Sequence, residues 1–266
     1  MKLKKIVTLA LTSVVALSIV GCSSSAADED KTIKVGASST PHAEILETIK
    51  PKLEEEGYKL EIKVMDDYVL PNTGVADGSL DANFFQHVPF LEQTIEERKL
   101  DLTYTAKVHL EPIGFYSEKV KSIEEIKDGA KIAIPNDVTN GARALKLLAD
   151  NGLIEIKDGE NITVKDITSN PKNIEIIEMN AEMIASTLSD VDGAVINTNY
   201  ALSAKLNPKK DALVLESTDS PYSNILACRE DNKDSDKIKA LTKALTSDEV
   251  RTFIEEKYEG SILPSF

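Results

Sequence analysis

The stretch from residue 131 to residue 153 reads KIAIPNDVTNGARALKLLADNGL. Its first five residues, 131–135, are mostly apolar, which is typical of a buried strand. A short polar turn follows them. From Asn140 onward apolar residues recur at helical spacing, and Gly152 lies near the expected C-terminal end of that helix. A buried strand that leads directly into an amphipathic helix predicts an α/β fold.

Strand-like and helix-like segments alternate along the rest of the chain in the same way. The expected strands are residues 32–37, 60–65, 80–85, 102–116, 131–135, 174–177, 193–196 and 225–228. The expected helices are residues 42–57, 89–99, 123–126, 140–153, 182–189, 236–245 and 248–258. Pro51 interrupts the first of these helices and is expected to kink or split it.

Two successive α/β units favour two lobes over a single sheet. Residues 102–116 are expected to carry the chain into the second lobe, and residues 224–229 to carry it back. We therefore expect one lobe from residues 31–113 together with 225–266, and the other from residues 114–224. A cleft between two lobes joined by extended segments is a natural site for a ligand that binds by hinge closure.

The N-terminus reads as a bacterial lipoprotein leader. Three lysines lie among residues 1–5, residues 6–20 are almost entirely apolar, and Gly21-Cys22 follows. This apolar run suits a signal peptide and is short for a membrane span. We expect residues 1–21 to be a signal peptide, Cys22 to carry the lipid, and residues 22–30 to be a flexible tether. The alternative is an ordinary signal peptide that happens to contain a cysteine.

Composition excludes several classes of protein. The 266 residues carry a formal net charge of −14, whereas a nucleic-acid binder needs a basic surface. With Cys22 lipidated, Cys228 has no partner for a disulfide. Cys228 lies in an apolar stretch, which predicts a buried small hydrophobic residue rather than a reactive thiol.

The sequence offers little that indicates catalysis. It contains no Gly-x-Ser-x-Gly, His-Glu-x-x-His, phosphate-binding loop or Cys-x-x-Cys motif. We therefore predict no catalytic residues, no cofactor and no metal. A metal site built from the three histidines, His42, His87 and His109, is a less favoured alternative, because none has a neighbour at ligand spacing.

Two polar stretches indicate recognition of a small molecule. The turn at residues 135–143 leads into a helix, so its N–H groups could face an anion and Arg143 could clamp a carboxylate. The alternative is an ordinary surface arginine. On the strand near Phe85, adjacent phenylalanines point to opposite faces, so one can lie in the core and the other beside His87 in the cleft. With Tyr68 they would form an aromatic slot that suits a thioether. These residues alone indicate a small zwitterion or organic anion.

Six ordered motifs resemble the methionine-binding lipoproteins (MetQ/NlpA type) of methionine ABC importers. They are PHAEIL at 41–46, DYVLPN at 67–72, DANFFQH at 81–87, PNDVTN through Arg143 at 135–143, AVINTNYA at 194–201 and SPYSN at 220–224. The resemblance implies a two-lobe type II periplasmic-binding-protein fold with the ligand between the lobes. It also implies a lipid-anchored protein on the extracytoplasmic face of the cell membrane, which delivers methionine to permease and ATPase subunits.

The same resemblance implies roles for individual residues. Tyr68, Phe85 and His87 would surround the methionine side chain, and Arg143 would bind its carboxylate. The implied polar contacts come from Asn140, Asn197, Tyr222 and Asn224. The sequence departs from the family at Glu111, where relatives often have an aromatic residue. The ligand could therefore be L-methionine, D-methionine, methionine sulfoxide or a methionine dipeptide.

Other functions remain as alternatives. The chain could bind another small amino acid, a dipeptide or an organic anion. An enzyme on the same scaffold would need an acid–base pair, for which only Glu111 with His87 or His109 is available. A surface adhesin or signalling protein is a third class.

Overall fold

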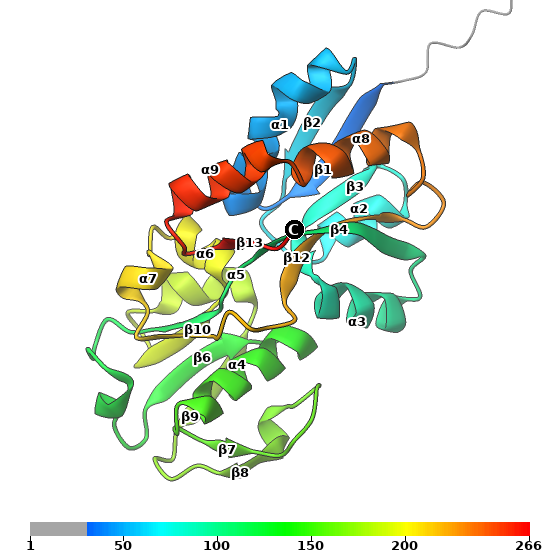
Figure 1. Ribbon diagram of the computed structural model, residues 1–266. Helices are drawn as coiled ribbons and strands as arrows, with labels where there is room; N and C mark the ends of the chain where they lie inside the picture. The colour runs from blue at the N-terminus through cyan, green and yellow to red at the C-terminus, as the bar shows by residue number, and fades with distance from the viewer. Residues whose placement is uncertain (1–30) are drawn as a thin grey trace, which may run out of the picture. The chain divides into compact units, whose positions relative to one another are not determined.

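The computed structural model describes residues 31–266 (Figure 1). The expected signal peptide, the lipidation site at Cys22 and the tether at residues 22–30 all lie outside the described residues. Within residues 31–266, two sheets with helices on both faces build the two-lobe α/β fold that the sequence predicts.

The first lobe is built on a six-stranded sheet in the order β13-β4-β12-β3-β1-β2. The first three strands of the chain pair in parallel, whereas β12 and β13 run antiparallel to their neighbours. Its strands are β1 (Thr32–Ala37), β2 (Lys59–Val64), β3 (Ala82–His87), β4 (Leu102–Leu110), β12 (Ser223–Arg229) and β13 (Leu263–Pro264).

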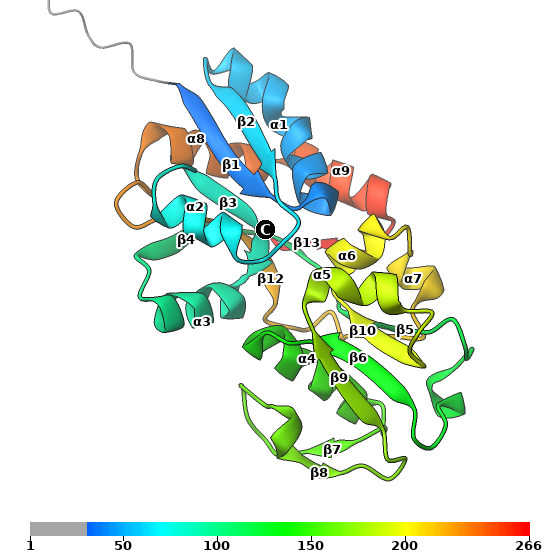
Figure 2. The ribbon, with the colours of Figure 1, turned by 180° about the vertical axis from the view of Figure 1, so that it is seen from behind.

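Helices cover both faces of this sheet, as the two opposite views show (Figures 1 and 2). One face packs against α1 (Glu44–Glu55), α8 (Asp236–Leu245) and α9 (Asp248–Tyr258). The other face packs against α2 (Leu70–Ala76) and α3 (Val88–Arg98). The helices form because their apolar residues recur at helical spacing. Each fully buried leucine or isoleucine contributes roughly 1.5–3 kcal/mol.

The second lobe contains a five-stranded sheet in the order β11-β5-β10-β6-β9. Leu145 and Leu148 of α4 pack on one face of it, and α5 and α6 cover the other. A separate two-stranded sheet pairs β7 with β8. The strands are β5 (Gly114–Tyr116), β6 (Lys131–Pro135), β7 (Glu155–Ile156), β8 (Ile167–Ser169), β9 (Glu175–Met179), β10 (Gly193–Ile196) and β11 (Val214–Leu215). The helices are α4 (Val138–Asp150), α5 (Ala181–Ile184), α6 (Thr198–Ser203) and α7 (Pro208–Asp211).

Two crossings connect the sheets. The chain passes from β4 in the first sheet to β5 in the second across residues 111–113, and it returns between β11 and β12. A helix follows the carboxyl end of each of three strands: α3 follows β3, α4 follows β6, and α6 follows β10. Asp137 is the N-cap residue of α4, and Asn197 is that of α6. In open α/β sheets ligands bind at the carboxyl ends of the strands, so this edge of each sheet is where a site is expected.

Several local expectations need correction. Pro51 does not split α1, which runs without a break from Glu44 to Glu55. Burial of Ile49 and Leu53 on either side of the proline offsets the one hydrogen bond that it removes. The α4 helix begins at Val138, two residues before the expected start, because the Asp137 side chain caps it. The expected helix at residues 182–189 is shorter, since α5 continues only as a tighter turn, Ala185–Thr187.

Among residues 31–266, no helix has the length and apolar character needed to cross a membrane.

Candidate functional site

A pocket lies where the carboxyl ends of the two sheets face each other. The first lobe and the crossing after β4 line it with Tyr68, Phe85, Gln86, His87, Phe90, Glu111 and Asn224. The second lobe lines it with Asn140, Arg143, Asn197, Thr198 and Asn199. The space open to the centre of a water molecule is only about 20 Å³, which is close to what one water requires. A larger ligand therefore enters only when the lobes or the lining side chains move.

One wall of the pocket is aromatic. The ring centroid of Tyr68 lies 5.7 Å from that of Phe85, 5.7 Å from that of Phe90 and 5.1 Å from that of Tyr200. Phe84, the neighbour of Phe85 in β3, points the other way into the core of the first lobe. The alternation along β3 thus divides the two phenylalanines between core and pocket, as the sequence predicts.

The Tyr68 hydroxyl connects this aromatic wall to the second lobe. It donates a hydrogen bond to Asn199 Oδ1 at 2.6 Å. A phenol that is buried needs such a partner, and here the partner belongs to α6. The bond therefore joins the two lobes at the pocket.

A chain of amide and imidazole groups forms the second wall. The Phe90 N–H donates to His87 Nδ1 at 3.2 Å, so His87 carries its proton on Nε2 and donates it to Asn140 Oδ1 at 3.1 Å. Asn197 Nδ2 donates to the same oxygen at 2.9 Å. Burial, with the nearby Arg143 charge, lowers the pKa of His87 to about 3, so the imidazole is neutral.

Arg143 of α4 also lines the pocket. Its Nε and Nη2 donate to the two carboxylate oxygens of Glu216, at 2.7 and 2.5 Å, and Nη2 also donates to the Glu111 main-chain oxygen at 2.6 Å. The guanidinium carbon lies 4.3 Å from the centre of the Tyr222 ring. These hydrogen bonds leave Nη1 for another acceptor. The side chain is 3% exposed, so it is a buried arginine rather than a surface one.

Two amide atoms at the pocket lack partners among the described residues. Asn197 Oδ1 and Asn199 Nδ2 are both buried and make no hydrogen bond. Buried polar atoms are almost always satisfied. One unpaired acceptor and one unpaired donor in a single pocket suit a ligand that offers both a donor and an acceptor.

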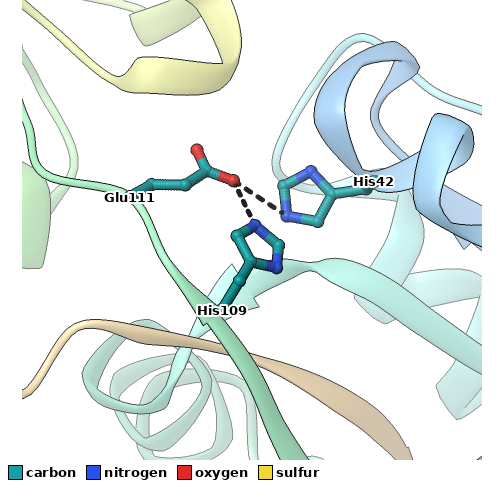
Figure 3. Close-up of side chains that lie close together, drawn as sticks. All are labelled: His42, His109 and Glu111. Carbon is teal, nitrogen blue, oxygen red and sulfur yellow. Dashed lines mark hydrogen bonds and ion pairs between the residues drawn. The ribbon is translucent and has the colours of Figure 1, made fainter. Parts of the chain in front are cut away.

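A buried cluster of three side chains adjoins the pocket (Figure 3). Both imidazole rings point their Nε2 atoms at one oxygen of Glu111: His109 Nε2 lies 2.7 Å and His42 Nε2 lies 3.3 Å from Oε1. His42 Nδ1 is also 2.6 Å from Ser38 Oγ, and its Nε2 is 3.0 Å from Asn224 Oδ1. Burial lowers the pKa of His42 to about 4 and that of His109 to about 3. It raises the pKa of Glu111.

The structure brings most of the residues singled out from the sequence to one place. Tyr68, Phe85, His87, Asn140, Arg143, Asn197 and Asn224 all line the pocket. Tyr222 lies just outside it, lining an adjoining groove, and touches His87 and Arg143. Sequence reasoning missed Gln86, Phe90, Thr198 and Asn199 in the lining of the pocket, and Glu216 as the partner of Arg143. Asn199 lies in a quoted motif, whereas nothing in the sequence near Glu216 connects it with Arg143.

Two expectations about chemistry also change. The Asp137 side chain caps α4 by accepting the Asn140 N–H at 2.9 Å, so this one N–H of the turn is not available to a ligand. The three histidines do not meet. His42 and His109 converge on Glu111, whereas His87 bonds to Asn140 in the other wall. Cys228 is buried, as expected, and burial raises its thiol pKa to about 11.

Comparison with known families decides the relationship. The sequence profile of the family described as NlpA lipoprotein matches residues 33–266. The chain belongs to the NlpA lipoprotein family. Within this family it is 44% identical to the methionine-binding lipoprotein MetQ of Bacillus subtilis, over 98% of this chain and 99% of that protein. It is 41% identical to the D-methionine-binding lipoprotein MetQ of Salmonella typhi, over 92% of each chain.

Solved structures of the family share the fold. A nutrient-binding protein from Burkholderia cenocepacia, solved bound to methionine, superposes with a TM-score of 0.85 at 44% identity. The match covers 88% of this chain and 100% of that one. The resemblance to methionine-binding lipoproteins seen in the sequence motifs is thereby confirmed at the level of the family and its fold.

Proposed function

We propose that this NlpA family member is a substrate-binding lipoprotein that captures methionine outside the cytoplasm and delivers it to an ABC importer. One observation carries the proposal: a single pocket is lined by aromatic rings, by a buried arginine and by polar groups from both lobes. Such a pocket matches an amino acid with an apolar side chain. Methionine bound to the relative from Burkholderia cenocepacia supports the same choice.

The aromatic wall would hold the side chain. Tyr68, Phe85 and Phe90 present ring faces and edges around one space. A thioether gains about 0.3–1.5 kcal/mol from each sulfur–aromatic contact, so this wall favours methionine over an alkyl side chain of the same length. His87 closes the wall as a neutral imidazole.

The charged end of the amino acid would lie between Arg143 and the asparagines. Nη1 of Arg143 can donate to the ligand carboxylate, and Asn199 Nδ2 supplies a second unpaired donor. Asn197 Oδ1 is an unpaired acceptor that can receive an ammonium proton. Asn140, Asn224 and Tyr222 would hold these groups in place through the contacts described above.

The remaining parts of the proposal concern the membrane and the transporter. Residues 1–21 would be removed, Cys22 would be lipidated, and residues 22–30 would let the folded part stand away from the membrane. Residues 31–113 with 225–266, and residues 114–224, would close on the ligand as two lobes. A permease and an ATPase subunit would receive the methionine. Replacement of Cys22 by serine is expected to move the protein from the membrane fraction to the soluble fraction.

We further propose that capture involves no chemical change, since the named relatives are binding proteins. Incubation of the protein with excess methionine, followed by mass spectrometry, is expected to return unaltered ligand. Turnover would favour the alternative of an enzyme on this scaffold.

Calorimetry tests the function directly. L-methionine, D-methionine and norleucine, which replaces the sulfur by a methylene, would be titrated into the folded protein. Methionine is expected to bind, and norleucine to bind more weakly. Arg143→Ala is expected to weaken binding by about 2–5 kcal/mol, whereas Arg98→Ala, at an exposed hydrogen bond to Thr73, serves as the matched control. Failure of the unaltered chain to bind either methionine would overturn the proposal.

A further inference from the structure

A groove between the two lobes adjoins the ligand pocket. The space open to the centre of a water molecule is about 600 Å³ in the groove, against about 20 Å³ in the pocket. α3 of the first lobe and α4 of the second lobe lie side by side there (Figures 1 and 2). Binding sites for small molecules have volumes of about 300–1,000 Å³. The groove therefore has room for an amino-acid residue that the pocket itself could not hold.

The side chain of Tyr222 separates the groove from the pocket. Tyr222 lines the groove and contacts two residues that line the pocket. Its ring centroid lies 5.0 Å from that of His87, and the guanidinium carbon of Arg143 lies 4.3 Å from the centre of the ring. The Tyr222 hydroxyl makes no hydrogen bond within residues 31–266, so the ring can rotate without breaking one. Such a rotation would connect the groove with the pocket beside Arg143.

One face of α4 runs from the pocket into the groove. Thr139 and Lys146 line the groove, and Arg143 lines the pocket. The three residues lie at positions i, i+4 and i+7 of the helix, which places them on one stripe. Residues three apart on a helix have Cβ atoms about 5–6 Å apart, and successive residues of a peptide have Cα atoms about 3.8 Å apart. One added residue of a ligand can therefore span the step from Arg143 to Lys146.

The charged side chains of the groove suit a residue with a free carboxylate. Lys146 Nζ makes one solvent-exposed hydrogen bond, to the Glu160 main-chain oxygen at 3.3 Å. Lys107 of β4 also lines the groove, and its side chain makes no hydrogen bond or ion pair in the part of the chain that the structure describes. Glu92 and Glu96 of α3 line the groove together with Glu160. The lysines can thus pair with a carboxylate, whereas the glutamates favour a basic side chain over an acidic one.

We propose that the groove binds the carboxyl-terminal residue of a methionyl dipeptide, and that Tyr222 opens and closes the passage between groove and pocket. The inference rests on the proposed function and deepens it. The methionine residue of the dipeptide would occupy the pocket as free methionine does. Arg143 would donate to the peptide carbonyl oxygen, and Lys146 and Lys107 would bind the terminal carboxylate. The ligand class is dipeptides with methionine first, and those with a basic second residue bind best.

Calorimetry with dipeptides tests the inference. Methionine, methionyl-alanine, methionyl-lysine, methionyl-glutamate and alanyl-methionine would be titrated into the unaltered chain, Lys146→Ala and Tyr222→Ala. Lys131→Ala is the matched control, because the Lys131 side chain is 54% exposed and lies at the start of β6 in the same lobe. Native mass spectrometry checks that each dipeptide is bound intact, and thermal unfolding checks that each variant is folded.

We expect Lys146→Ala to weaken binding of methionyl-alanine by about 2- to 5-fold, the effect of a solvent-exposed charge pair, and to leave methionine binding unchanged. Tyr222→Ala should raise the affinity for methionyl-alanine relative to methionine, because no ring then has to move. Methionyl-lysine should bind more tightly than methionyl-glutamate. Binding of alanyl-methionine, whose added residue lies at the other end, should not respond to Lys146→Ala.

Three results would overturn the inference and leave the proposed function intact. In the first, methionine binds but methionyl-alanine binds neither to the unaltered chain nor to Tyr222→Ala. In the second, Lys146→Ala changes the affinities for methionine and methionyl-alanine equally. In the third, Lys131→Ala weakens binding of methionyl-alanine as much as Lys146→Ala does. Failure of the unaltered chain to bind both methionine and methionyl-alanine would overturn the inference and the proposed function together.

Discussion

Arg143 and Glu216 form a two-point ion pair, with Nε to Oε1 at 2.7 Å and Nη2 to Oε2 at 2.5 Å. The arginine is 3% exposed and the glutamate 14% exposed. The pair holds the guanidinium plane in a fixed orientation over Tyr222. It also means that a ligand carboxylate meets an arginine whose charge is already partly compensated.

The substitution Glu216→Gln should separate the orientation of the Arg143 guanidinium from the compensation of its charge. The new amide would keep one acceptor for Nε but would leave the buried Arg143 charge without its partner. We expect a lower melting temperature without ligand, because breaking a buried pair costs about 3–5 kcal/mol. We also expect a larger rise in melting temperature on adding methionine, since its carboxylate would restore the pairing. A smaller rise than in the unaltered chain would contradict this view of the site.

The hydrogen bond from Tyr68 to Asn199 should stabilise the closed arrangement of the lobes. Tyr68→Phe keeps the ring against Phe85 and removes the hydroxyl. We expect about 0.5–1.5 kcal/mol weaker methionine binding, measured by calorimetry. Tyr104→Phe is the matched control, because Tyr104 is 39% exposed and lies outside the pocket. Equal affinities for the two variants would show that the bond does not contribute.

Asn224→Ala is expected to affect the fold as well as binding. Asn224 Oδ1 lies 3.0 Å from His42 Nε2. In the sheet, Asn224 of β12 lies opposite His87 of β3 on one side and His109 of β4 on the other. Removing the amide takes an acceptor from a fully buried imidazole, which should cost about 1–3 kcal/mol of unfolding free energy. Urea denaturation measures this cost. A stability equal to that of the unaltered chain would mean that Glu111 alone satisfies His42.

Stability should fall as the pH falls from 7 to 5. Burial lowers the pKa of His42 to about 4 and the pKa values of His87 and His109 to about 3, against 6.5 for an ordinary histidine. Below pH 6.5 the unfolded chain therefore binds more protons than the folded one. The loss approaches about 1.4 kcal/mol per pH unit for each histidine. Buried Glu111 and Asp137, whose pKa values are raised, act in the opposite direction.

A single variant isolates the contribution of one histidine. His87→Gln keeps a polar side chain in the pocket wall and removes one titrating group. Its free energy of unfolding should depend less steeply on pH between about 4 and 6.5. The same slope in the variant and the unaltered chain would exclude His87 as a source of the effect.

Much of the fold follows from local patterns. The β6–α4 unit, and the two terminal helices at 236–245 and 248–258, are where periodicity places them. Short elements such as β7, β8, β11 and β13 are not predicted, because two or three residues carry no measurable period. Tertiary pairing, rather than local preference, forms these strands.

The candidate site residues could be predicted where they lie in a recognisable sequence motif. They could not be predicted where a residue contacts the site from a distant part of the sequence. Arg143 stands out because it follows a polar turn, but Glu216 is 73 residues away and lies in a stretch without a motif. Likewise, His109 and Glu111 are two residues apart, and only the packing of the turn at Ser39–Ala43 adds His42 to them. The spacing of residues in the sequence shows which side chains are neighbours on one helix or strand. These contacts depend instead on how different helices, strands and loops pack together.

The narrowness of the pocket has a consequence for unloading. With room for little more than one water, the pocket cannot release a ligand of methionine size unless the lobes or the lining side chains move. Separation of the lobes would break the hydrogen bonds from Tyr68 to Asn199 and from His87 to Asn140 in the same motion. A partner protein that pulls the two lobes apart would thus release the ligand in one step, because the contacts from the two lobes would be lost together.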